Sequence, residues 1–524
     1  MKRNLLRTLV SGMVFAAGLS LAQAQEIKIG LAADITTIDP HFANQDAVSA
    51  VCAHLYETLV SLSPDGRLAP GLALSWKTLG KETVWEFKLR KGVKFHNGEE
   101  MTAEDVAFSI DRPATITNST TPFTGYTKAI VSKKIIDPYT IQFTTATPYP
   151  LLPNDLNRIF IVSKKATENA TTEDFNTGKV DAGSGPYKLV KYARGQNIQL
   201  ARNDAYWGDK PAWATVNLKM LPNEPARMAA LLSGDVQAVE KVQPNLVAKF
   251  KANKDLTVVG KTSTRVLFLY VDFRDTTPFA FDKAGKKLDK NPLKDVRVRQ
   301  AISKLINRKL LSEKILDNLG LPTANIAAPG MFGFNPALKP DVYDPAGAKK
   351  LLAEAGYPNG FAITFFSSND RFINDEQVAL TIGQMLSRGG IDTKVETMPF
   401  SSYVGKASKK ELGFGLLGWG VGGGEPSGAM RGLLATTDKD NGMGAYNWAS
   451  YSNPKFDSVL LEAIRTVDDA KREKLLAEAA EIAVSKDYAL IPLYNQVATW
   501  AVKKGIAFVP RSDEFTLAYQ FKPE

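Results

Sequence analysis

The chain has 524 residues, with 65 Lys and Arg against 55 Asp and Glu, and a formal net charge of +10. This length exceeds what one hydrophobic core supports and predicts about three domains. The charge is mild and forms no long basic run, which argues against nucleic-acid binding because that function needs clustered Lys and Arg with stacking aromatics.

The N-terminus has the pattern of a secretory signal peptide. A basic region (Lys2, Arg3, Arg7) precedes an apolar run over Leu9–Leu21, and the small residues Ala22 and Ala24 mark a cleavage site. The run is short for a membrane span, so an anchor helix is the less favoured alternative. Residue 25 is Gln and not the Cys that lipid attachment requires. We therefore expect removal of residues 1–24 and a soluble periplasmic chain without a lipid anchor.

The first half of the chain contains strand patterns and one clearly capped helix. Alternating apolar residues predict strands over Glu26–Gly30 and Trp85–Leu89. Thr102 has the position of a helix N-cap, and Asp105 lies three residues on, a pair that predicts a capping box. Pro113 is expected to end this helix because proline cannot donate an intrahelical hydrogen bond.

The second half alternates helices and strands. Asp344 and Pro345 occupy the N-cap and first position of a helix, which Gly356 should end. Strands are expected over Phe361–Phe366 and Thr393–Thr397, with a helix between them. This order predicts a parallel strand pair joined by a right-handed crossover, and the whole pattern indicates an α/β fold.

Cysteine and histidine content limits the possible chemistry. The single cysteine, Cys52, excludes an intramolecular disulfide, and its apolar surroundings predict a buried structural residue. The three histidines, His41, His54 and His96, lack the i, i+4 spacing that places two metal ligands on one helix face. We expect His96, beside the turn residues Asn97–Gly98, to be exposed to solvent. The sequence predicts neither a metal site nor a cofactor.

Motifs of known catalytic sites are missing. The sequence has no Gly-x-Ser-x-Gly nucleophile elbow and no phosphate-binding loop ending in Gly-Lys-Ser/Thr. The one Ser-x-x-Lys, at Ser452–Lys455, is interrupted by Pro454 and lacks its companion motifs. The glycine cluster Gly418–Glu425 lacks the helix and downstream acid of a dinucleotide fingerprint. We therefore expect no catalytic residues and no enzymatic activity.

Several segments in a common order carry a family resemblance. The most specific are Trp85–Ile110, Gly183–Tyr187 and Asn203–Gly208. Further matching segments are Leu68–Trp76, Ile136–Ile141, Ala229–Val236, Val296–Ile302 with Ile306–Arg308, and Ala348–Pro358. Together they resemble the solute-binding proteins of ABC importers, in the group that captures peptides, nickel and related solutes (extracellular solute-binding proteins, family 5).

The resemblance implies a two-lobed periplasmic-binding-protein fold with a hinge and an extra subdomain inserted in the first lobe. Carried onto this chain, the first lobe spans residues 25–70, 182–275 and 494–524. The insert spans residues 71–181 and the second lobe residues 276–493. The two hinge crossings are then expected near residues 275 and 494.

The implied function is to capture a peptide or peptide-like organic solute between the lobes. A monomer would deliver it to an ABC permease of the inner membrane, with its ATPase. Within this class the alternative is a non-peptide solute, such as a sugar derivative, an opine-like compound or a metal chelate. The alternative from another class is a periplasmic hydrolase, against which the missing nucleophile and base motifs argue.

The resemblance places the ligand contacts on loops that face the cleft between the lobes. One loop follows the first strand, and another is the glycine-rich loop after Trp419. A third lies near residue 494, where the chain crosses back to the first lobe. Arg371 is a candidate partner for an anionic group, with a solvated surface arginine as the equally open alternative. The other candidates are Asp34, Thr36, Thr37, Trp419, Gly420, Val421, Gly422, Tyr494 and Asn495.

The glycine-rich loop departs from the pattern of peptide-binding relatives. Those proteins place an Asp three residues after the tryptophan, where it pairs with the free amino terminus of the ligand. Here that position is Gly422, and the nearest acid is Glu425. A buried ammonium without a partner is costly. We therefore expect the ligand group at this point to be neutral or anionic and to meet glycine N–H groups.

Overall fold

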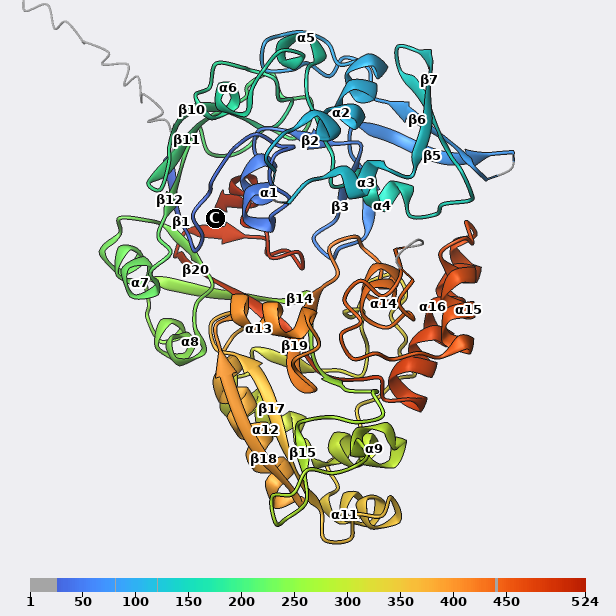
Figure 1. Ribbon diagram of the computed structural model, residues 1–524. Helices are drawn as coiled ribbons and strands as arrows, with labels where there is room; N and C mark the ends of the chain where they lie inside the picture. Colours follow the sequence, from blue (N-terminus) through green and yellow to red (C-terminus); the bar gives the residue numbers. More distant parts are fainter. Residues whose placement is uncertain (1–25, 81, 120, 439–441) are drawn as a thin grey trace, which may run out of the picture.

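The computed structural model describes residues 26–80, 82–119, 121–438 and 442–524. The signal peptide expected over residues 1–24, and the mature start at Gln25, lie outside these ranges. Figure 1 shows an upper part, coloured blue to teal and joined by the red C-terminal end, above a lower part coloured green to orange.

One large sheet runs through both parts of the molecule. Its strands follow the order β10-β11-β12-β1-β13-β20-β14-β19-β17-β15, with β16 beside β20 and β18 beside β17, which makes 12 strands within the described ranges. The bounds are β1 (Glu26–Leu31), β10 (Tyr187–Ala193), β11 (Asn197–Arg202), β12 (Thr215–Met220), β13 (Ala238–Glu240), β14 (Leu256–Val271), β15 (Ala280–Phe281), β16 (Gly320–Pro322), β17 (Phe361–Ser368), β18 (Ile391–Met398), β19 (Phe414–Gly420) and β20 (Leu490–Lys503).

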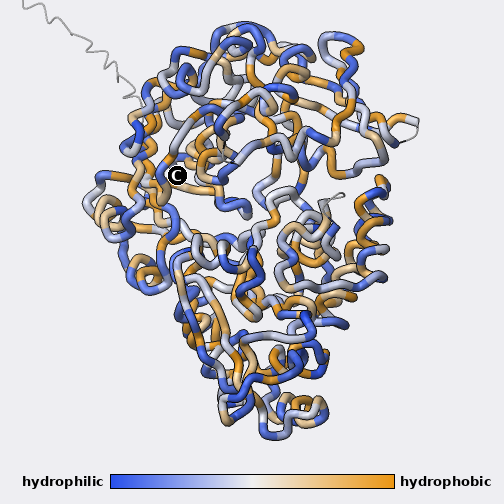
Figure 2. Tube along the Cα trace, viewed as in Figure 1, coloured by the Kyte–Doolittle hydropathy of each residue, from blue (hydrophilic) through white to orange (hydrophobic). Residues whose placement is uncertain are grey.

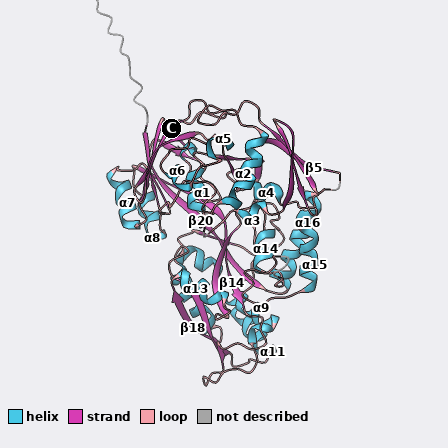
Figure 3. Cartoon of the chain, turned by 45° about the horizontal axis from the view of Figure 1, so that its top comes forward, coloured by secondary structure: helices cyan, strands magenta, loops and turns pink. Residues whose placement is uncertain are grey.

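The long strands β14 and β20 connect the two parts (Figure 3). They pair antiparallel along most of their length, and the register is irregular between Thr262 and Val266. The second half of β14 also pairs with β19, where Arg265 lies opposite Gly420. The crossing predicted near residue 275 lies beyond the end of β14, and the one predicted near residue 494 lies inside β20.

The helices around the large sheet cover both of its halves. In the upper part they are α1 (Asp46–Cys52), α7 (Glu224–Ser233) and α8 (Pro244–Lys251). In the lower part they are α9 (Val296–Leu305), α10 (Arg308–Leu310), α11 (Pro345–Glu354), α12 (Asp375–Arg388), α13 (Phe400–Ser408), α14 (Ser427–Leu433), α15 (Pro454–Ala463) and α16 (Asp469–Ala480).

A second, antiparallel sheet occupies the upper part, with strand order β5-β6-β8-β7. Its elements and those around it are β5 (Ala73–Leu79), β6 (Val84–Leu89), β7 (Ile130–Asp137), β8 (Thr140–Thr145), α2 (Ala103–Thr115), α3 (Thr124–Thr127), α4 (Leu152–Leu156), α5 (Lys164–Thr167) and α6 (Thr172–Asn176). Three short strand pairs complete the chain, namely β2 (Glu57–Thr58) with β9 (Phe160–Ile161), β3 (Val60–Leu62) with β4 (Leu68–Pro70), and β21 (Ile506–Phe508) with β22 (Phe521–Pro523).

Local signals in the sequence located several elements correctly. The capping box at Thr102 and Asp105 is confirmed. Asp344 caps α11 by accepting a hydrogen bond from the Gly347 N–H at 2.8 Å. Strands β17 and β18 are parallel, as predicted, and α12 connects them. The prediction that Pro113 ends its helix is wrong, because α2 continues to Thr115. The missing N–H of Pro113 falls in the last turn, where it removes only one bond before the helix ends.

The apolar residues form four cores. Figure 2 shows the hydrophobic stretches along the strands and the hydrophilic ones mostly in the outer loops. One core lies behind β1 and β10–β12, one under the sheet of the insert, and one in the lower part beside α14–α16. The fourth follows β14 and β20 and continues from α7 and α8 to α12. Cys52 is fully buried, as predicted, and burial raises the pKa of its thiol.

No helix of the described segments combines the length and the apolar character that a membrane span requires.

His96 is buried, contrary to the expectation of a solvated turn residue. The segment that begins at Gly183 packs over it. The His96 Nε2 lies 3.0 Å from the Gly185 carbonyl, and its Nδ1 lies 3.3 Å from Asp181. A Cβ at Gly183 would stand 1.9 Å from the Leu55 carbonyl, so only glycine permits this close approach.

Candidate functional site

A cavity of about 1370 Å³ lies between the two parts of the molecule. Its walls come from segments far apart in the sequence, including α1, the middle of β14, the loop before α12, the glycine-rich loop and the C-terminal segment. The charged and aromatic lining residues of interest are Asp46, Arg158, Arg265, Arg371, Trp419, Tyr446, Arg511, Asp513, Glu514 and Phe515.

Half of the residues predicted as ligand contacts line this cavity. They are Arg371, Trp419, Gly420, Val421 and Gly422. The other five lie outside the lining: Asp34 and Thr36 are exposed elsewhere, and Thr37, Tyr494 and Asn495 are buried. The Thr37 hydroxyl donates to the Asn176 side chain at 3.0 Å, which gives it a structural contact. Nearby residues of the same segments, Ala32, Ala33 and Gln496, line the cavity instead.

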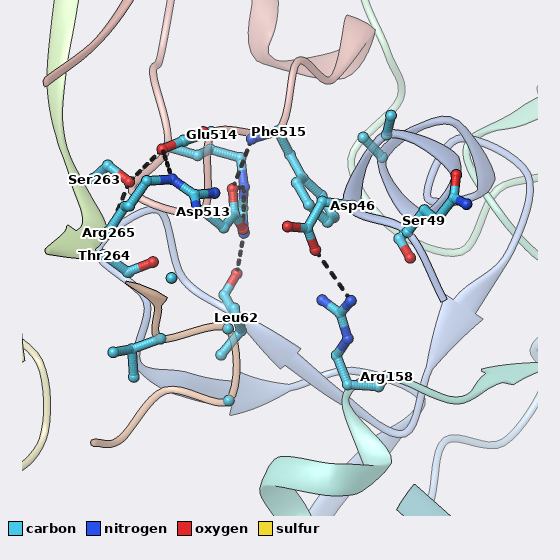
Figure 4. A pocket seen from close by; sticks show the side chains of 18 of the residues that line it. Asp46, Ser49, Leu62, Arg158, Ser263, Thr264, Arg265, Asp513, Glu514 and Phe515 are labelled. Atoms are coloured by element: carbon cyan, nitrogen blue, oxygen red, sulfur yellow. Dashed lines mark hydrogen bonds and ion pairs between the residues drawn. The ribbon is translucent and has the colours of Figure 1, made fainter. Parts of the chain in front are cut away.

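Arg158 lies two residues after the end of α4 and lines the cavity. Its Nη2 donates to Asn44 Oδ1 and to Asp46 Oδ1, both at 3.2 Å. The Arg158 side chain is 13% exposed, whereas that of Asp46 is 65% exposed. Figure 4 shows this ion pair in the middle of the cavity. Sequence reasoning missed both residues, because neither belongs to a motif and only the tertiary fold brings them together.

A second charged group lies where β14 meets the C-terminal segment (Figure 4). The Arg265 Nε lies 3.4 Å from Glu514 Oε1, and the same oxygen accepts a 2.6 Å hydrogen bond from the Ser263 hydroxyl. Arg511 pairs closely with Asp513, with its Nε 3.0 Å from each carboxylate oxygen. The Arg511–Asp513 pair is therefore nearly neutral, while Arg265 keeps only a long, single contact.

Arg371 faces the cavity from the loop before α12. Its guanidinium lies 5.4 Å from the ring centre of Phe400 and 5.8 Å from that of Phe372, within reach of cation–π attraction. Among the described residues, no carboxylate is within ion-pair distance of Arg371. Burial lowers the pKa of Arg371, and the nearby charge of Arg265 lowers it further.

The glycine-rich loop after β19 lies against two guanidinium groups. A Cβ on Gly420 would stand 3.4 Å from Arg265 Nη2, as expected from their cross-strand pairing, and a Cβ on Gly422 would stand 3.9 Å from Arg158 Nη1. The Asn154 side chain donates to the Gly423 carbonyl, so the insert touches this loop directly. Trp419 packs edge-on against Tyr446, with ring centres 5.1 Å apart, and forms an aromatic wall.

Glu425, the acid nearest to Gly422 in the sequence, lines the cavity but is paired with an arginine of the protein. It is buried and accepts a 3.1 Å bond from Arg472 Nε. Burial raises the pKa of Glu425, and the charge of Arg472 opposes this rise. No cluster of His, Cys, Asp and Glu within the described ranges has the arrangement that a metal ion requires.

The molecule has two α/β lobes joined by a pair of long strands, and a polar cleft with aromatic walls lies between the lobes. This arrangement defines a two-lobed binding protein. Residues 67–441 match the model of the bacterial extracellular solute-binding proteins, family 5. The chain therefore belongs to this family, whose members are described as solute-binding proteins and not as enzymes. This confirms the fold and the class of function that the sequence indicated.

Individual relatives are distant but match nearly the full chain. Glutathione-binding protein GsiB of Escherichia coli O1:K1 / APEC is 27% identical, covering 92% of this chain and 91% of the relative. The dipeptide-binding protein of Escherichia coli strain K12 is 26% identical, covering 87% and 86%. The solved structure of HbpA2 from Haemophilus parasuis superposes with a TM-score of 0.81 at 20% identity, covering 95% of this chain and 100% of that one.

Proposed function

We propose that this protein captures an organic solute of peptide size between its lobes, in the periplasm. It then delivers the solute, as a monomer, to the permease of an ABC importer that an ATPase drives. The observation that carries the proposal is the cavity of about 1370 Å³ between the lobes, lined by guanidinium groups, carboxylates and aromatic rings. Such a mixture of charged and apolar groups suits a small polar organic molecule. Relatives named for glutathione and dipeptide binding support this size range.

A ligand retained through purification tests this function. We expect that protein purified from its native host and then denatured releases one small organic compound at near-equal molar amount. Native protein incubated with that compound should return it unchanged, because a binding protein has no turnover. Cleavage of the compound by the protein would instead support the periplasmic hydrolase.

The hinge of the proposed lobe closure lies within the paired strands β14 and β20. Their ladder is irregular between Thr262 and Val266, beside the segment that lines the cavity at Ser263–Arg265. Such a break interrupts the continuous hydrogen bonding that would stiffen the crossing. The closure is a rigid-body shift between open and closed states.

Ligand binding is expected to make the molecule more compact. Small-angle X-ray scattering with the released compound at saturation should give a smaller radius of gyration than the ligand-free protein. The control is the same measurement with an equal concentration of a compound that calorimetry shows not to bind. Identical scattering curves at saturating ligand would contradict closure about this hinge.

A further inference from the structure

We infer that a line of contacts between the upper and lower parts of the molecule stabilises the closed state of the cleft, and that Arg67 and Asn154 are positioning residues for this state. We call this line the seam. It joins Gly66, Arg67 and α4 of the upper part to Gly330, Gly423, Gly424 and Arg431 of the lower part. The inference rests on the proposed function, because a closed state matters for a protein that captures a solute between its lobes.

The first contact of the seam lies between α4 and the glycine-rich loop. In Figure 1, α4 lies above α14, and the glycine-rich loop leads into α14. Asn154 of α4 is only 6% exposed, and its side-chain amide donates to the Gly423 carbonyl. Gly424 has a φ of +80°, and a Cβ on it would stand 3.2 Å from the Gly66 carbonyl oxygen and 3.5 Å from Asn154 Nδ2. The loop therefore packs directly against the upper part, at a distance that glycine permits.

The second contact is a hydrogen bond outside the cavity. Arg67, in the turn between β3 and β4, donates through its Nε to the Gly330 carbonyl of the lower part at 2.8 Å. Neither residue lines the cavity, so the bond joins the two parts without facing the space for the solute. Its loss should therefore act on the arrangement of the two parts and not on contacts to the solute.

The third contact brings a positive charge of the lower part to a buried carboxylate of the upper part. The Tyr149 hydroxyl donates to Asp155 Oδ2 at 2.7 Å, and Arg431 of α14 lies beside this hydroxyl. Burial raises the pKa of Asp155 to about 7, and the charge of Arg431 opposes this rise. The charge of Lys128 opposes the rise as well, whereas that of Glu425 adds to it. The attraction between Arg431 and Asp155 is lost when the cleft opens.

The seam begins beside the proposed hinge. A Cβ on Gly66 would stand 3.5 Å from Thr264 Cγ2, in the stretch of β14 where the strand register is irregular. Rotation about this stretch would separate the contacts of the seam. A contact that is present in only one of two states shifts the populations of both. Because the seam consists of groups of the protein, we expect it to maintain a closed population in the ligand-free protein, to which solute binding adds.

Single-molecule energy transfer between two dyes on the ligand-free protein tests the inference. Ser132→Cys on β7 and Lys474→Cys on α16 place one dye on each part of the molecule, at exposed positions. The native Cys52 is fully buried, so it should not react with the dyes. We expect a long-distance and a short-distance population, which correspond to the open and the closed cleft.

Two variants should shift these populations toward the open cleft. Arg67→Met keeps the apolar stem of the side chain and removes the donor, so it should lower the closed-to-open ratio about three-fold. Asn154→Leu should lower the ratio by a similar factor, and the double variant should lower it about ten-fold. Urea unfolding with the same midpoint as wild type would show that Arg67→Met is folded.

Arg297→Met is the matched control. Arg297 is exposed, as Arg67 is, and its Nη1 donates to the Glu354 carbonyl at 2.7 Å. Both of these residues belong to the lower part, so the bond does not cross the cleft. The variant should leave the closed-to-open ratio unchanged.

Three results would overturn the inference. They are a ligand-free wild type without a closed population, a double variant with the same closed-to-open ratio as wild type, and a control variant that lowers the ratio as much as Arg67→Met. None of these measurements uses a solute. The proposed function is judged separately by the compound released from purified protein, so it can stand when the inference fails.

Discussion

Replacing Arg112 by Met is expected to lower the free energy of unfolding by about 3–5 kcal/mol. The Arg112 guanidinium forms a two-pronged ion pair with Asp39, with Nη1 at 2.7 Å and Nη2 at 2.8 Å from the two carboxylate oxygens. Both side chains are almost completely buried. Burial alone would raise the pKa of Asp39, but its hydrogen bonds and charge contact with Arg112 lower that pKa below the ordinary value. Without Arg112, a buried carboxylate loses its compensating charge.

Urea unfolding of matched variants measures this effect. Arg194 forms an ion pair with Glu173 at the surface, where both side chains are more than half exposed. Arg194→Met should therefore change the free energy of unfolding by less than about 1 kcal/mol. A double variant, Arg112→Met with Asp39→Leu, should recover part of the loss because it removes both charges. A stability of Arg112→Met within about 1 kcal/mol of wild type would contradict the argument.

The Asp39–Arg112 pair also bears on the cleft. Asp39 lies on the loop that leads from β1 to α1, and α1 carries Asp46, the partner of Arg158. Loosening of this loop should therefore weaken ligand binding as well as stability. The effect would reach the ligand through the position of Asp46 and Arg158.

Sequence patterns predicted the elements that depend only on residues close together in the chain. The caps at Thr102 and Asp344 depend on residues within one helical turn, so the sequence alone reveals them. The exposure of His96 depends on a segment nearly 90 residues away that packs over it, and a turn motif carries no information about that contact. Arg158 and Arg265 were missed for the same reason, since only the fold places them beside the glycine-rich loop.

The predicted crossing near residue 494, where the chain returns to the first lobe, shows a second limit of prediction from sequence. Sequence resemblance selected Tyr494 and Asn495 there, but the structure places Gln496, Ala498 and Trp500 on the cavity wall. Alternate residues of a strand face opposite sides, so Asn495 points away from the side that carries Gln496. Tyr494 shares the side of Gln496 but is buried in the core along β14 and β20, where it pairs with Pro322 of β16. The correct segment was predicted, whereas the face of the strand that meets the cavity depends on how β20 packs against β14. The contact roles of Tyr494 and Asn495 stay predictions.

Acid is expected to destabilise the wild-type protein relative to a His54→Gln variant. Burial lowers the pKa of His54 from 6.5 to about 4. Between pH 6.5 and pH 4 the unfolded chain therefore binds a proton at His54, while the folded chain does not. The stability that neutral His54 provides is complete above pH 6.5 and declines as the pH falls toward 4. This pKa shift corresponds to a loss of about 3 kcal/mol in the free energy of unfolding. A glutamine side chain does not titrate, so the variant lacks this loss.

The contacts of His54 explain why its neutral form is required. Its Nδ1 lies 3.0 Å from the Ala50 carbonyl and donates to it, and its Nε2 accepts a 2.9 Å hydrogen bond from the Ala518 N–H. A second ring proton would replace that acceptor by a donor facing a donor. The bond holds the C-terminal segment, which carries Glu514 to the cavity, against the end of α1.

Comparing the two proteins is necessary because other buried groups respond to pH in the opposite direction. Burial raises the pKa values of Glu57 and Asp155 to about 7, so acidification favours the folded state at these two groups. Their contributions are shared by wild type and His54→Gln and cancel in the difference. Urea unfolding of both proteins at intervals from pH 7 to pH 4 should therefore give curves that converge or cross as the pH falls. Curves that stay parallel would show that His54 is protonated as readily in the folded chain as in the unfolded one.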